Sequence, residues 1–173
     1  MIQKSLSFLL QWALIILMVT LTTVVVVAVV FRKLDASLSW YDEVASILLS
    51  WVTYYGAALA ALNRKHIGFD TVLLAIPMPV RMWATALSEA LVIGFFFILA
   101  WAGWEVLQVL EGDSLVSLTW VPVQFTQSVI PIGALLFVVC ELMSLPAYWC
   151  AIAAGQSLGH EEVESEIEQV PRS

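Results

Sequence analysis

Three glutamates lie inside long apolar stretches of this sequence, and they are the side chains best placed to do chemistry: Glu89, Glu105 and Glu141. A carboxylate inside a membrane can bind an ion or relay a proton. Glu89 and Glu105, however, would be turned roughly 160° from one another around a helix, so they would not share a face. Contacts between helices or with interfacial water are the simpler roles for all three. Glu141, near the middle of its stretch, is the strongest candidate for an ion path.

Metal and redox chemistry are poorly supported. His66 and Asp70 have the i, i+4 spacing that can orient a metal ion, but the one further histidine, His160, lies far along the chain. A complete metal site or a haem with paired axial ligands is therefore not expected. Cys140 and Cys150 would lie about 15 Å apart along a helix, too far for a disulfide. Because the sequence also has no glycine-rich phosphate loop and no nucleophile elbow, we expect no enzyme activity and no cofactor.

The composition is that of an integral membrane protein. Hydrophobic residues make up 61% of the chain and charged residues 12%, about half the charged fraction of a soluble domain. The apolar stretches predict an all-α fold with four transmembrane helices, at about residues 6–31, 40–62, 82–110 and 128–154. Pro77 and Pro79 end a shorter apolar stretch that predicts an interfacial helix between the second and third spans. Residues 1–155 are expected to form the membrane domain, and residues 156–173 an acidic tail.

Aromatic residues and prolines give further expectations for these spans. Several tryptophans fall near predicted span ends, where an aromatic belt explains them: Trp12, Trp40, Trp83, Trp120 and Trp149. Trp101 and Trp104 fall deeper and are expected to pack against a partner helix. Residues 111–127 form a connection that is either extended or turned, and Pro146 is expected to kink the fourth span. No basic cluster suggests a nucleic-acid partner.

The second span holds most of the polar residues. Ser39 could cap its start, because Asp42 follows three residues later as in a capping box. One face carries small or polar side chains, namely Glu43, Ser46, Ser50, Thr53, Ala57 and Ala60. Bulkier side chains cluster elsewhere, namely Leu48, Val52, Tyr55, Leu59 and Leu62. A small, polar face marks where another helix approaches closely in lipid, so we expect this helix to have a partner.

Basic residues predict the orientation. With the N-terminus inside, the inner side would hold five of the seven basic residues, Lys4, Arg64, Lys65, Arg81 and Arg172. The outer side would hold only Arg32 and Lys33. The positive-inside rule therefore favours both termini in the cytoplasm.

Residues between Arg32 and Asp70 resemble the small membrane subunit of tripartite ATP-independent periplasmic (TRAP) transporters, the DctQ type. The residues that carry the likeness are Arg32, Ser39, Trp40, Asp42, Glu43, Trp51, Gly56, Ala57, His66, Ile67 and Asp70. The four-span layout and the IPIG sequence at residues 130–133 also fit. Many family members have a basic residue three positions after the motif glutamate, where this chain has Ser46. Glu43 is therefore expected to find a cation elsewhere, at Arg32 or on a partner.

The resemblance implies a role without catalysis. Such a subunit lies in the bacterial inner membrane and scaffolds the large DctM-type permease subunit, which carries the substrate and sodium sites. It also helps to dock a periplasmic substrate-binding protein that delivers an organic anion, such as a C4-dicarboxylate or sialic acid. The residues themselves point the same way, because four spans without an internal repeat make a poor carrier on their own.

Two other functions stay open at this point. The chain could be a stand-alone membrane sensor or assembly factor that uses its acidic tail as a cytoplasmic contact. It could also be a small ion channel that uses Glu141.

Overall fold

The structure, a computed structural model, describes residues 2–36, 38–63 and 77–154. Its helices are α1 (Ile2–Lys33), α2 (Tyr41–Leu62), α4 (Met78–Val109), α5 (Val123–Gln127) and α6 (Val129–Ala154). Four spans are long and apolar enough to cross a membrane, the last running through α5 and α6. The described residues form no strand beyond an isolated bridge between Ser114 and Pro122, so the predicted all-α class is confirmed. The interfacial helix and the acidic tail that the sequence predicts lie outside the described residues.

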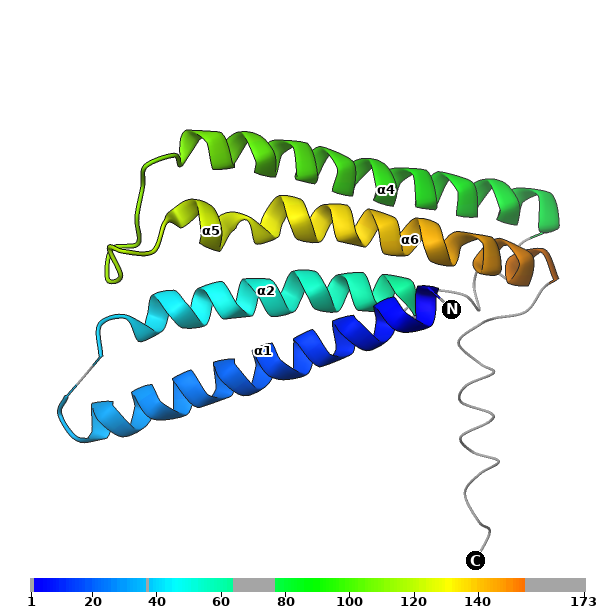
Figure 1. Ribbon diagram of the computed structural model, residues 1–173. Coiled ribbons are helices and arrows are strands. Elements are labelled where there is room, and N and C mark those ends of the chain that lie inside the picture. The colour runs from blue at the N-terminus through cyan, green and yellow to red at the C-terminus, as the bar shows by residue number, and fades with distance from the viewer. Residues whose placement is uncertain (1, 37, 64–76, 155–173) are drawn as a thin grey trace, which may run out of the picture.

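The helices lie in a row, in the order α1, α2, α6, α4 (Figure 1). α1 and α4 run in one direction and α2 and α6 in the other, so the two middle helices are parallel and α1 begins and α6 ends at the same end of the row. We call this the terminal end. The α1–α2 connection and the α4–α5 connection lie together at the other end, which we call the loop end. A row has two open faces, and α2 and α6 in its middle each pack against a helix on either side.

Small side chains let the middle helices pack closely. Ala58 and Ala61 of α2 and Cys140 of α6 are fully buried in a cluster that also includes Leu10 of α1. The rings of Phe96 and Phe137 stack at 3.7 Å between centroids and fix α4 against α6. Since lipid gives no hydrophobic drive for helix pairing, this close packing is what holds the row together.

Two glycines mark the closest approaches to α6. A Cβ added at Gly103 of α4 would lie 2.9 Å from the Ile130 side chain, and one at Gly133 of α6 would lie 2.6 Å from Tyr54 Cβ of α2. Real Cβ atoms do not come that close. The IPIG sequence therefore forms the place where both neighbours touch α6.

Prolines divide the helices differently from the prediction. Residues 123–127 were expected within a connection, but they form α5. Only Ser128 separates α5 from α6. Pro131 has no N–H for the carbonyl of Gln127, so the α-helical ladder is interrupted there. Pro77 is the N-cap of α4 and Pro79 lies in its first turn, where proline is tolerated. As a result α4 begins at Met78, earlier than expected.

The structure also bears on two smaller expectations, the cap of the second span and the state of the cysteines. The capping prediction is wrong, because α2 begins at Tyr41 with Trp40 as its N-cap and no side-chain hydrogen bond there. Cys140 and Cys150 are both free, as predicted.

Candidate functional site

An exposed ridge runs along α2 on one open face of the row. Ser46, Ser50 and Thr53 are exposed, and Ala57 and Ala60 continue the same face with partial burial. We call these five residues the α2 ridge. Its hydroxyls donate to carbonyls one turn earlier in the helix, Ser46 to Asp42 at 2.8 Å, Ser50 to Ser46 at 3.0 Å and Thr53 to Leu49 at 2.8 Å. The ridge is therefore small in cross-section and already satisfied in its hydrogen bonding.

Glu43 leaves this ridge and binds a loop of its own chain. Its carboxylate accepts hydrogen bonds from the backbone N–H of Val116 at 3.1 Å and of Ser117 at 2.9 Å, and from the Ser117 hydroxyl. Within the described residues these groups, rather than Arg32, are the partners of Glu43. The predicted cation is replaced by oriented amide dipoles, which stabilise a carboxylate by hydrogen bonding.

Trp51 makes a second link, which joins α2 to α5. Its indole N–H donates to the carbonyl of Thr126 at 3.4 Å, and its ring contacts Tyr55 and Phe125 with centroids 5.6 and 6.0 Å apart. Since Glu43 and Trp51 are two turns apart, they tie the loop-end half of α2 to both the α4–α5 connection and α5.

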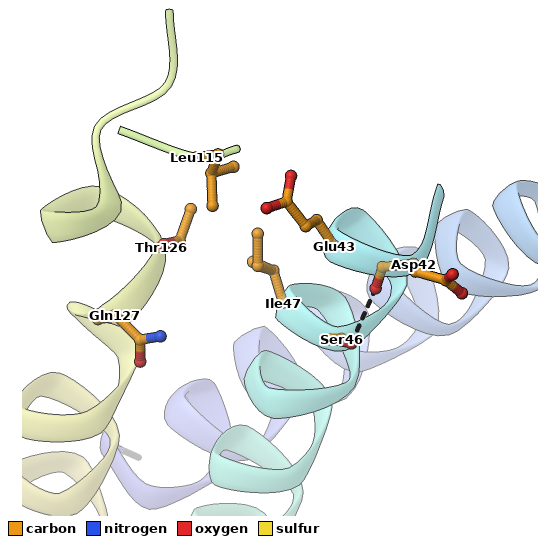
Figure 2. Close-up of a pocket in the computed structure, with 7 residues that line it drawn as sticks. All are labelled: Asp42, Glu43, Ser46, Ile47, Leu115, Thr126 and Gln127. Atoms are coloured by element: carbon orange, nitrogen blue, oxygen red, sulfur yellow. Dashed lines mark hydrogen bonds between the residues drawn. The ribbon is translucent and has the colours of Figure 1, made fainter. Parts of the chain in front are cut away.

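A hollow of about 320 Å³ opens between these links (Figure 2). It is lined by Asp42, Glu43, Ser46, Ile47, Leu115, Thr126 and Gln127. Figure 2 shows that Glu43 reaches from α2 toward the segment that carries Leu115, while the Asp42 carboxylate points away from that segment. The described residues contain no group of three or more acidic, histidine or cysteine side chains that could hold a metal ion. The arrangement suits contact with another macromolecule better than bond chemistry.

A comparison with protein families decides what kind of protein this is. The family model for the DctQ component of tripartite ATP-independent periplasmic transporters matches residues 21–150, about three quarters of the 173 residues. This chain belongs to the DctQ family. None of the curated proteins compared with it matches. The family match confirms the resemblance seen in the sequence and makes the chain the small membrane component of a TRAP transporter.

The remaining motif residues of this DctQ chain take several positions. Arg32 and Ser39 are exposed at the loop end, and Trp40 is partly buried. A Cβ at Gly56 would meet only Leu14 at 3.9 Å, an ordinary contact. His66 and Asp70 lie outside the described residues.

The three intramembrane glutamates are not brought together. Glu105 is exposed, Glu89 is partly buried, and Glu141 is buried in α6 near Ser144, which is also buried. Arg81 and Thr85 are likewise buried and lie in the first turns of α4, which begins at the terminal end. Trp101 and Trp104 are exposed, so none of the described helices covers them.

Sequence reasoning missed the residues that Glu43 and Trp51 bind. Ser117 and Thr126 lie roughly 75 positions later in the chain and carry no motif of their own. The polar side chains of Ser117 and Thr126 were the only signal in the sequence that could have pointed to these contacts.

Proposed function

We propose that this DctQ chain is the small, non-catalytic subunit of a sodium-coupled transporter that takes up organic anions, carboxylates such as C4-dicarboxylates or sialic acid. It scaffolds the DctM-type permease subunit and helps to dock the periplasmic substrate-binding protein. On this proposal the chain lies in the inner membrane, and the distribution of its seven basic residues favours both termini in the cytoplasm.

The α2 ridge is the observation that carries this proposal. Ser50 and Thr53 are exposed on this chain although they sit in a span, and their hydroxyls already have acceptors. Exposed leucines and phenylalanines on α4 suit lipid, whereas a small, satisfied surface lets another helix approach closely and gain van der Waals contact. The row has an open face there, which a large subunit can cover.

Tryptophan substitutions on the ridge test the scaffold role. Ser50→Trp and Ala57→Trp should each abolish co-purification with the permease subunit, because the indole keeps the two helices apart. Leu91→Trp is the matched control, since Leu91 is an exposed residue of α4 outside the ridge. The complex should survive that control, and its survival with both ridge variants would overturn the assignment of the interface.

A further inference from the structure

The α4–α5 connection, residues 110–122, is an ordered loop. Gly112 adopts a φ of +93°, a left-handed conformation that turns the chain just after α4. Backbone hydrogen bonds then close the loop on itself, from Leu115 N to Val121 O at 3.1 Å and from Val123 N to Asp113 O at 3.0 Å. The loop therefore presents one defined surface at the loop end of the row.

Glu43 fixes this loop to α2. The two N–H groups that it accepts, those of Val116 and Ser117, belong to adjacent residues near the loop tip. Hydrogen bonds to an ionised carboxylate are stronger than bonds between neutral groups. The loop is held at both ends by α4 and α5 and at its tip by α2, so its tip is pre-organised.

Two large apolar side chains stand out from this fixed loop. Val116 is 90% exposed and Trp120 is 79% exposed. Exposed apolar side chains on a loop that hydrogen bonds hold in one conformation are typical of a binding surface, where aromatic residues act as anchors.

The same loop also carries exposed acidic side chains. Glu111 and Asp113 are both exposed on the same loop. Among the described residues, the basic side chains at this end are Arg32 and Lys33 at the end of α1, which is the neighbour of α2 rather than of α4 and α5. This charge pattern repels anionic phospholipid headgroups and attracts a positively charged protein surface.

We propose that the 110–122 loop, which exposes Val116 and Trp120 together with the acidic Glu111 and Asp113, docks a soluble protein whose contact patch combines apolar and lysine- or arginine-rich side chains. On the function proposed above, on which this inference rests, that protein is the substrate-binding protein of the same transporter. Glu43 acts as a positioning residue that keeps the tip in place.

The test measures binding of that substrate-binding protein to the complex of this chain and its permease subunit in nanodiscs. Trp120→Ser should weaken binding about tenfold, as the loss of an aromatic anchor does. Asp113→Lys should weaken it by a similar factor and make the affinity less sensitive to salt, because an attractive charge has been removed. Trp83→Ser is the matched control: Trp83 is also 79% exposed but lies at the terminal end, and its loss should change affinity less than twofold.

Glu43→Gln has its own readout. It should speed hydrogen exchange in residues 113–121 and weaken binding in parallel, and faster exchange with unchanged binding would contradict its positioning role. Unchanged binding by Trp120→Ser and Asp113→Lys would overturn the proposal, as would an equal loss in Trp83→Ser. Failure of the wild-type chain to co-purify with the permease subunit would instead count against the proposed function.

Discussion

Gly133 sits where α6 meets the ring of Tyr54, and the missing side chain is what that contact requires. A Cβ there would lie 2.6 Å from Tyr54 Cβ and 2.9 Å from two ring atoms. Tyr54 Cβ belongs to the rigid start of its side chain and cannot swing away, so the helices themselves would have to separate. Glycine at this position therefore serves packing rather than backbone freedom.

We predict that Gly133→Ala lowers the free energy of unfolding by about 1–3 kcal/mol, the usual cost of overpacking a tight contact. Reversible unfolding of the detergent-solubilised chain in SDS, followed by circular dichroism, measures this. Gly94→Ala is the control, because nothing lies within 4 Å of a Cβ at that helical position, and it should be neutral or stabilising by up to about 1 kcal/mol. Equal stability of Gly133→Ala and the wild type would show that the α2–α6 contact is looser than described.

At the scale of the elements, α2 shows what a sequence pattern can and cannot predict. Its period separates small from bulky side chains, and Ser46, Ser50 and Thr53 on the small face are exposed. It does not reveal a third face, where Trp51, Tyr54 and Ala58 contact α5 and α6. A helix in the middle of a row packs against a neighbour on each of two sides. Dividing its residues only into a small face and a bulky face therefore does not identify the second packing side.

Local signals also failed where a distant segment decides the structure. The spacing at Ser39 predicted a side-chain cap, but α2 has none, and Glu43 in its first turn binds the 110–122 loop instead. The connection before α6 was expected to run to Gln127, but α5 begins at Val123 and ends at Gln127, whose carbonyl receives no N–H from Pro131. The four spans themselves were predictable, because length and hydropathy alone specify them.

At the scale of the whole molecule, the row of helices explains why this DctQ chain suits a supporting role. Both of its faces are open, and exposed apolar side chains cover much of α1 and α4. The buried acidic residue, Glu141, lies in a contact between neighbouring helices of the row rather than in a ring of helices around a pore. This arrangement favours a platform for a larger subunit over the channel alternative.

We predict that the purified chain alone, reconstituted in liposomes, passes no ions and no organic anion. Deleting residues 160–173 should leave uptake by the complete transporter intact. Conductance from the chain alone that is lost in Glu141→Gln would favour the channel. Loss of uptake on tail deletion, with the complex still assembled, would favour the sensor or assembly factor.

Photo-crosslinking from the α2 ridge tests the central claim most directly. A photoreactive amino acid is placed in turn at Ser46, Ser50 and Thr53 in cells that express the whole transporter, with Leu91 of α4 as the lipid-facing control position. The account predicts that all three ridge positions capture the permease subunit and that position 91 does not. Ridge positions that capture only phospholipid, or capture the permease subunit no better than position 91, would contradict it.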